Sequence, residues 1–166
     1  MKRREFLRHA TWSTAGMLLP LKWASAGALP PDPFYANGFP DTQGRQVELA
    51  QYLGKPLVLN FWATWCAPCV KEMPDLDMLH KKHDGVNFVG LAVDTPVNVQ
   101  KFGTKVQVSY PLLIAGHGGI QLMRDLGNKQ GGLPFTVVFN ENGQLSHKIL
   151  GQVKPDELDR FIKDLV

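Results

Sequence analysis

The residues in this chain most suited to chemistry are its two cysteines, which stand together as Cys66-Ala67-Pro68-Cys69. A structural disulfide across two intervening residues closes a very small ring, and so small a ring removes little entropy from the unfolded chain. Such a bridge therefore adds little to the stability of the folded chain. Paired thiols at this spacing are better suited to thiol–disulfide exchange, in which a thiolate attacks a disulfide and a second cysteine resolves the mixed disulfide.

The segments on either side place the pair at the start of a helix. Residues 57–62 form a nearly continuous apolar run bounded by turn residues, which predicts a central strand covered on both faces. A helical pattern follows from about residue 66 to 83, with Pro68 in its first turn, where a missing N–H costs nothing, and Pro74 inside it, where a kink is expected. Unpaired N–H groups and the helix dipole at this end favour a thiolate at Cys66. We therefore expect Cys66 to be the nucleophile and the more buried Cys69 to resolve the mixed disulfide.

The rest of the pattern alternates strands with helices and closes with a hairpin and a helix. Residues 27–40 are rich in Pro, Gly and Ala and predict an irregular strap, whereas 49–53 predict one helical turn. Asn142-Gly143 is a hairpin turn signal. We expect further strands at 86–93, 110–114, 135–139 and 145–150, and further helices at 97–105, 118–126 and from 155 onward. This order predicts an α/β fold with a mixed central sheet and helices on both faces.

The first 26 residues have the composition of a targeting segment. They hold five basic residues and one acid in a chain of formal net charge +3, so the surplus charge lies here and indicates no nucleic-acid surface. Arg3-Arg4-Glu5-Phe6-Leu7-Arg8 resembles a twin-arginine export signal, and Ala24-Ser25-Ala26 is a pattern that a signal peptidase accepts. We expect a signal peptide at 1–26, a domain at 27–166 and a periplasmic location, with a membrane tether if the leader is not cleaved.

The residues around the cysteines, together with an apolar strand ahead of them, form a recognisable signature. It consists of Phe61-Trp62-Ala63-Thr64-Trp65-Cys66-Ala67-Pro68-Cys69 followed by Glu72-Met73-Pro74. This signature resembles the TlpA/ResA-like branch of the thioredoxin superfamily and implies a thioredoxin-like fold. The resemblance also implies that Leu133-Pro134 is the cis-proline loop beside the active site, where the Leu133 backbone pairs with a substrate strand. We expect Trp65, Pro68, Leu133 and Pro134 to bind substrate.

Two polar residues refine this interpretation. Thioredoxins carry a buried Asp six residues before the first cysteine, and this chain has Asn60 there, which cannot accept a proton. In the ResA-like branch the acid near the pair is a Glu three residues after the second cysteine, and Glu72 matches it. We expect Glu72 to assist catalysis by taking a proton from Cys69. The alternative is that Glu72 is a solvated acid on the helix surface.

His80 and His83 follow the cysteines at a spacing that superficially matches a zinc site. On one helix, Cys66 and His80 would lie about 21 Å apart, at about 1.5 Å per residue. Zinc ligands lie within about 2.3 Å of the metal. We therefore expect no metal site, and no cofactor besides the redox-active Cys66–Cys69 disulfide.

Together, the residues and the resemblance predict a periplasmic enzyme that exchanges electrons with the cysteines of other proteins. The resemblance implies a reducing role, such as preparing apocytochrome c or copper-site thiols, and a thiol electron donor in the membrane. We expect a monomer with no nucleic-acid partner. One alternative is a binding module without redox turnover, either a holdase or a copper(I) metallochaperone. Another is a thiol peroxidase, which the neighbours Trp65 and Ala67 disfavour.

Overall fold

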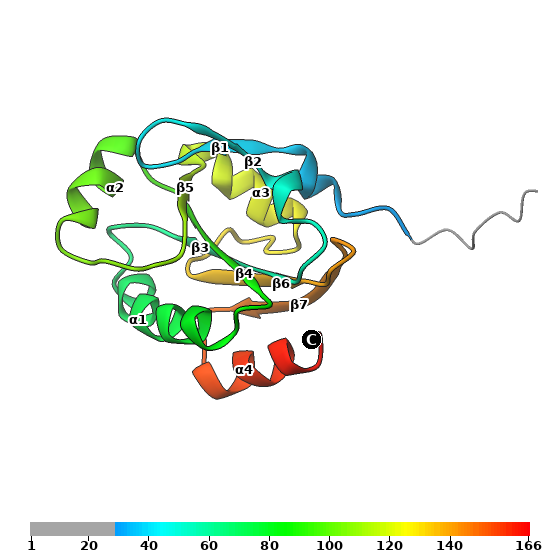
Figure 1. Cartoon of the computed structure of the whole chain (residues 1–166). Helices are drawn as coiled ribbons and strands as arrows, with labels where there is room; N and C mark the ends of the chain where they lie inside the picture. The colour runs from blue at the N-terminus through cyan, green and yellow to red at the C-terminus, as the bar shows by residue number, and fades with distance from the viewer. Residues whose placement is uncertain (1–28) are drawn as a thin grey trace, which may run out of the picture.

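A central five-stranded sheet is the middle layer of the domain (Figure 1). The computed structural model describes residues 29–166, so the predicted signal peptide lies outside the described residues, as does the predicted domain start at 27. The strands of the sheet are β3 (Leu57–Trp62), β4 (Asn87–Ala92), β5 (Leu112–Ile114), β6 (Phe135–Phe139) and β7 (Leu145–Leu150). The helices are α1 (Ala67–Lys82), α2 (Pro96–Gly103), α3 (Gly119–Asp125) and α4 (Pro155–Lys163). The strand order is β5-β4-β3-β6-β7, which confirms the predicted mixed sheet.

Strand β3 is the centre of the sheet and is buried along its whole length. It runs parallel to β4 and antiparallel to β6, with Phe61 opposite Phe135. Because both of its faces are covered, its sequence is a continuous apolar run with a single polar exception, Asn60. The antiparallel pairing brings the end of β3, which leads to Cys66, to the same edge as the start of β6, which follows Pro134. The redox pair and the proline loop are thus placed together by the register of two strands.

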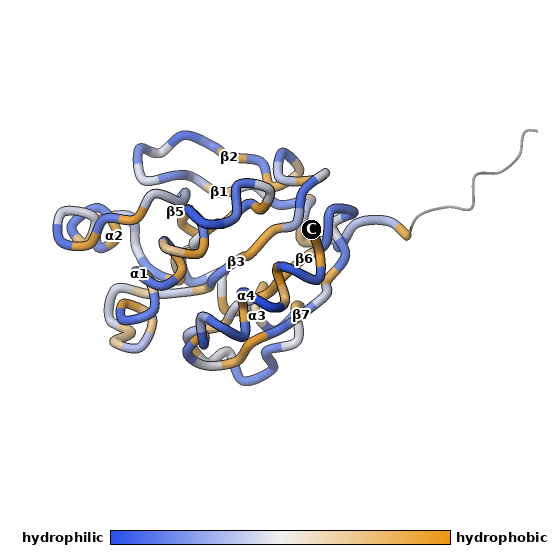
Figure 2. Tube along the Cα trace, turned by 60° about the horizontal axis from the view of Figure 1, so that its bottom comes forward, coloured by the Kyte–Doolittle hydropathy of each residue, from blue (hydrophilic) through white to orange (hydrophobic). Residues whose placement is uncertain are grey.

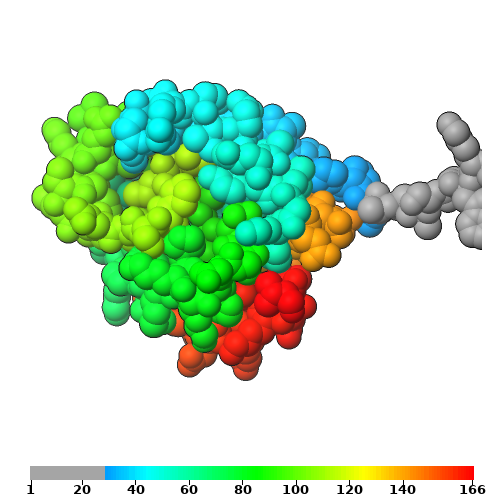
Figure 3. Space-filling view, in the orientation of Figure 1, coloured from blue at the N-terminus to red at the C-terminus, as the bar shows by residue number. Residues whose placement is uncertain are grey.

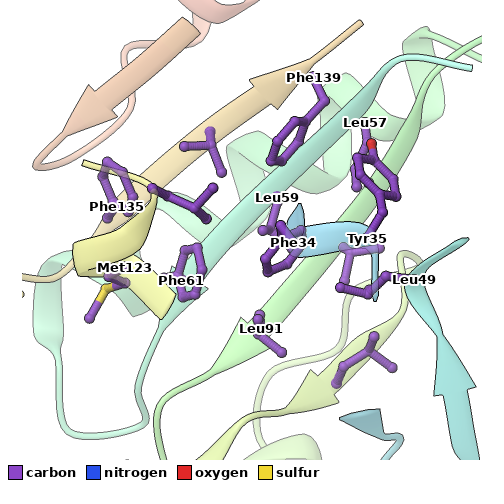
Figure 4. Close-up of a cluster of buried hydrophobic side chains, with 14 of the residues drawn as sticks. Phe34, Tyr35, Leu49, Leu57, Leu59, Phe61, Leu91, Met123, Phe135 and Phe139 are labelled. Atoms are coloured by element: carbon purple, nitrogen blue, oxygen red, sulfur yellow. The ribbon is translucent and has the colours of Figure 1, made fainter. Parts of the chain in front are cut away.

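One face of the sheet is covered by α3 and by the N-terminal part of the chain (Figure 4). This part comprises two short 3-10 helices, η1 (Pro33–Ala36) and η2 (Leu49–Tyr52), and the hairpin of β1 (Gly38–Pro40) and β2 (Gln46–Glu48). The helical turn predicted at 49–53 is therefore confirmed, and Gly44, with a φ of 82°, turns the hairpin. Phe34 stacks on Phe139 with 5.7 Å between ring centroids, which fixes η1 to the sheet.

The expectation of an irregular strap at 27–40 is wrong from residue 33 onward, because η1 and β1 form there. Asp32 caps η1 by accepting a hydrogen bond from the Phe34 N–H at 2.9 Å, and Pro33 occupies the first turn. The strap is held to the hairpin turn between β6 and β7, where the Asp32 N–H donates to the Gly143 carbonyl at 2.8 Å. Two buried aromatic residues, Phe34 and Tyr35, thus anchor a segment whose composition suggests a loop.

Helices α1 and α4 cover the opposite face of the sheet. Their apolar residues pack with Val58 and Val138 of the sheet, and Figure 2 shows the corresponding alternation of hydrophobic and hydrophilic positions along α4. Asp159 of α4 joins the two helices, because it accepts from His83 and pairs with Lys82 at 2.7 Å each. None of the helices in the described part of the chain is long and apolar enough to cross a membrane.

A third apolar cluster lies between the redox pair and α2. Its buried members include Trp62, Met73, Val99 and both cysteines. The remaining partly buried side chains that pack against it include Phe102 and Leu133. The disulfide therefore sits on a packed apolar floor and not on a mobile loop.

Candidate active site

The two cysteines form a disulfide at the N-terminus of α1, with 5.3 Å between their Cα atoms. Cys66 is the N-cap residue of this helix, and its sulfur accepts a hydrogen bond from the Cys69 N–H at 3.3 Å. The sequence predicts this position because the turn Ala63–Trp65 ends the strand and Pro68 fits the first helical turn. When the disulfide is reduced, the same N–H group and the helix dipole stabilise a thiolate on Cys66.

The two cysteines differ in their exposure to solvent. Cys66 is 6% exposed, whereas Cys69 is fully enclosed. A partner protein can reach only the sulfur that touches the surface, so Cys66 is the residue placed to attack. The order of events expected from the sequence, with Cys66 first and Cys69 second, agrees with this geometry.

The loop before β6 lies beside the cysteines. The Leu133–Pro134 peptide bond is cis, as the resemblance implies. Leu133 packs against the cluster that contains both cysteines, and Pro134 is buried with its carbonyl accepting from the Gly151 N–H at 2.9 Å. The structure therefore brings Leu133 and Pro134, which follow Cys69 by 64 and 65 residues, to the redox pair.

The two tryptophans of the signature have opposite environments. Trp65, which directly precedes Cys66 in the sequence, is 70% exposed. Trp62 is fully buried in the apolar cluster that contains the cysteines. Pro68 is also exposed, at the first turn of α1. Trp65 and Pro68 thus form surface next to the reactive sulfur, and Trp62 belongs to the core. A large exposed aromatic ring at this place is suited to contact a partner.

Glu72 is completely buried, so the alternative of a solvated helix acid is wrong. Its carboxylate accepts from Asn60 Nδ2 at 2.7 Å and from the Val153 N–H at 2.7 Å. Burial raises the pKa of the Glu72 carboxyl, and these two hydrogen bonds only partly offset the effect. Since residues three apart on a helix are neighbours, Glu72 lies one turn from Cys69. A buried acid with a raised pKa at this distance is suited to exchange a proton with the Cys69 thiol.

Asp94 is a further buried acid that the sequence does not single out. It follows β4 and is 5% exposed. It accepts from the Thr64 N–H at 3.0 Å, the Thr64 hydroxyl at 2.6 Å, the Thr95 N–H at 2.7 Å and Asn98 Nδ2 at 2.8 Å. Burial alone would raise the pKa of Asp94, but these hydrogen bonds outweigh it and hold the pKa below its usual range. Asp94 thereby ties the Thr64 turn, just before Cys66, to the start of α2. An acid directly after a buried strand is the one sequence signal that could have indicated it.

The two histidines at the end of α1, His80 within the helix and His83 at its C-cap, have separate surroundings. His83 Nε2 lies 2.7 Å from Asp159 Oδ1, and the His80 ring lies against Phe88 and Tyr110. Across residues 29–166, no three His, Cys, Asp or Glu side chains are grouped as metal ligands.

A broad hollow in the described surface lies away from the disulfide. It has a volume of about 730 Å³ and lies between the β1–β2 hairpin, α2 and the segment 106–113. The cyan and yellow-green segments that line it adjoin in Figure 3. It includes neither cysteine, nor Trp65, nor the Leu133–Pro134 loop, so we place the active site at the disulfide and not here.

A solvent-touching cysteine at a helix N-terminus, an enclosed second cysteine and an adjoining cis-proline loop define a thiol–disulfide oxidoreductase of thioredoxin-like fold. The AhpC/TSA family profile matches residues 31–148. The thiol-disulfide oxidoreductase ResA of Geobacillus kaustophilus (strain HTA426) is 30% identical over 128 residues, which cover 75% of this chain and 71% of ResA. The chain therefore belongs to the AhpC/TSA family and is a relative of the ResA thiol–disulfide oxidoreductases.

Solved structures show the same architecture. MTB DsbF, in its mixed oxidized and reduced forms, is 27% identical with a TM-score of 0.72, and the match covers 82% of this chain and 99% of DsbF. A secreted Mycobacterium tuberculosis disulfide oxidoreductase homologous to E. coli DsbE is 25% identical with a TM-score of 0.68, covering 81% of this chain and 99% of that one. The fold and the class of chemistry predicted from the sequence are confirmed.

Proposed function

We propose that this protein is an exported reductant of disulfides in other proteins. The observation that supports the reducing direction is the buried carboxyl of Glu72, one helical turn from Cys69. In its ionised form this carboxylate disfavours a thiolate on Cys69, because like charges repel strongly in a site of low dielectric, and it so disfavours the reduced pair. A dithiol destabilised in this way gives up its electrons readily.

In the proposed cycle, the Cys66 thiolate attacks one sulfur of the partner's disulfide. A bond forms between Cys66 and that sulfur, and the other partner sulfur leaves as a thiolate. Glu72 accepts the proton of the Cys69 thiol, and the Cys69 thiolate then attacks the Cys66 sulfur. The second partner sulfur leaves, the partner has gained two electrons, and the Cys66–Cys69 disulfide has formed. Trp65 and Pro68 supply exposed surface on which the partner strand rests, and the loop of Leu133 and the buried Pro134 lies beside that strand.

The proposed location is the periplasm, with apocytochrome c or copper-site thiols as the class of substrate and a membrane thiol as the electron donor. The twin-arginine-like leader at 1–26 supports export. The similarity to an oxidoreductase described as secreted also supports it. Cell fractionation of the full chain tests the location directly, since a protein confined to the cytosolic fraction would contradict it.

The reduction potential of the Cys66/Cys69 couple tests the direction. Equilibration against a thiol buffer should give a value near or below about −270 mV, the potential of thioredoxin. A value of about −120 mV, that of a strong oxidant, would mean that the protein forms disulfides in its partners and does not reduce them. Cys66→Ser should abolish exchange, and Cys69→Ser should accumulate the mixed disulfide. If Cys66→Ser retains the activity of the native chain, the protein is a binding module and not an oxidoreductase.

A further inference from the structure

A small pocket opens beside the redox pair, on its α2 side. Its volume is about 260 Å³, and its lining residues are Thr64, Asn98, Lys101, Phe102 and Lys105. Thr64 is two residues before Cys66 and directly before the exposed Trp65. A partner that contacts the Cys66 sulfur is therefore brought next to a residue of the pocket lining.

The floor and one wall of the pocket are held in place by contacts already described. Asp94 binds both Thr64 and Asn98, so these two residues cannot move independently. Phe102 packs against the buried Trp62 with 5.1 Å between ring centroids, which provides a fixed apolar wall. The pocket is thus formed before any partner arrives.

The charge of the pocket is positive. Lys101 and Lys105 are both exposed, and neither forms an ion pair with a carboxylate among residues 29–166. Asp94, the acid bound to Thr64 and Asn98 of the lining, accepts hydrogen bonds from Thr64, Thr95 and Asn98 and forms no ion pair with either lysine. By contrast, the lysines at the far end of α1 and on α4 do have partners: Lys81 pairs with Asp77, while Lys82 and Lys163 pair with Asp159.

We propose that this pocket binds a carboxylate side chain of the partner protein and so selects disulfides that have an acidic residue near the attacked cysteine. The two ammonium groups supply the charge, and the Phe102 ring fits the methylene groups of a glutamate. An extended chain spans about 3.3 Å per residue, so an acid two or three residues from the partner's cysteine reaches the pocket. This inference rests on the proposed function and adds the substrate preference of the same site.

Two disulfide-bonded peptides, identical except for Glu or Gln at two positions beside one cysteine, test the preference. The reduced full chain should reduce the Glu peptide about tenfold faster than the Gln peptide at low ionic strength, and added salt should shrink the ratio. In the double variant Lys101→Gln/Lys105→Gln the ratio should fall to about one, because neutral side chains no longer attract the carboxylates. Lys101→Glu/Lys105→Glu should instead favour a peptide with Lys at those positions.

Lys55→Gln is the matched control. Lys55 is exposed and precedes β3, at the edge of the sheet opposite the disulfide, so its variant should keep the native ratio. If the native chain reduces both peptides equally, or if the Lys101/Lys105 variants keep the native ratio, the inference is wrong while the proposed function stands. If neither peptide is reduced by the native chain, the proposed function fails and the inference fails with it.

Discussion

The carboxylate of Glu72 accepts a hydrogen bond from the backbone N–H of Val153 at 2.7 Å, across 81 residues of sequence. This bond fastens the middle of α1 to the segment that leads into α4. Glu72 also lies one helical turn from Cys69, so one buried acid both joins two parts of the fold and neighbours the redox pair. A change at Glu72 therefore has to be separated into its effects on folding and on chemistry.

Glu72→Gln should separate these effects. The glutamine carbonyl can accept from the Val153 N–H, and its amide can donate to the Asn60 side chain. Asn60 Oδ1 has no hydrogen-bond partner among residues 29–166, and it becomes the acceptor if the Asn60 amide turns over. We expect the unfolding free energy to change by about 1 kcal/mol or less. Resolution of the mixed disulfide should slow by about 100-fold, because the proton acceptor is lost.

The pH profile distinguishes a proton acceptor from a structural residue. In the native chain the rate of resolution should rise with pH as Glu72 loses its proton through its raised pKa, and this rise should be missing in Glu72→Gln. Glu141→Gln, at an exposed turn on the opposite edge, is the control and should keep the native profile. A profile for Glu72→Gln that matches the native one would rule out the proposed role.

Asn60→Asp should make stability depend strongly on pH. It places a second carboxylate about 2.7 Å from that of Glu72, and two carboxylates this close cannot both ionise. The folded pKa of the pair is raised, so the variant is stable at low pH and loses stability as pH rises. We expect urea unfolding to show a loss of about 2–4 kcal/mol between about pH 5 and pH 8, at about 1.4 kcal/mol for each pKa unit. The exposed turn variant Asn142→Asp should show no such loss.

The tryptophan pair offers a test of where the partner binds. Trp65→Ala removes an exposed ring, so the unfolding free energy should change by about 0.5 kcal/mol or less. Its rate of exchange with a protein substrate should fall about tenfold or more, as for an aromatic residue central to an interface. Trp62→Ala should do the opposite and destabilise the fold by about 3–5 kcal/mol. An unchanged rate for Trp65→Ala with a protein substrate would mean that partners bind elsewhere.

Asp94→Asn should weaken the turn before Cys66. The variant cannot accept from all of the donors on Thr64, Thr95 and Asn98, so we expect a loss of about 1–3 kcal/mol in unfolding free energy at neutral pH. The native pKa of Asp94 is lowered, so its contribution is present at neutral pH and is lost as pH falls through that lowered value. Native and variant stabilities measured by denaturant should therefore converge in acid, and a constant difference would contradict this account.

Much of the fold follows from local sequence. Strand β3 and the hairpin turn at Asn142-Gly143 are predicted because a doubly covered strand needs apolar residues throughout and a tight turn needs a residue that tolerates positive φ. Gly143 has a φ of 74°. Helix α1 is predicted from Pro68 and the spacing of Met73, Leu76 and Leu79, which are all buried. The disulfide and the cis bond at Pro134 are likewise in the positions expected.

The rest depends on contacts between distant segments. The sequence around Phe34 has no period that indicates burial, because η1 is held by Phe139 from the other end of the domain. The environment of Glu72 depends on hydrogen bonds from Asn60 and Val153, and no local sequence pattern indicates that either residue contacts Glu72. The pocket at Lys101 likewise exists only because the topology brings α2 next to the Thr64 turn.

The attachment of the strap to the hairpin turn between β6 and β7 has a further consequence. Leu29 accepts from Gln144 Nε2 at 3.1 Å at that turn. Because β6 runs antiparallel to β3, the turn and the disulfide lie at opposite edges of the sheet, and the described chain begins at the right of Figure 1, away from α2. Anything fused or anchored ahead of residue 29 is therefore attached at the pole opposite the reactive sulfur. A molecule held at a surface by that end would direct Cys66 outward, open to a bulky folded partner.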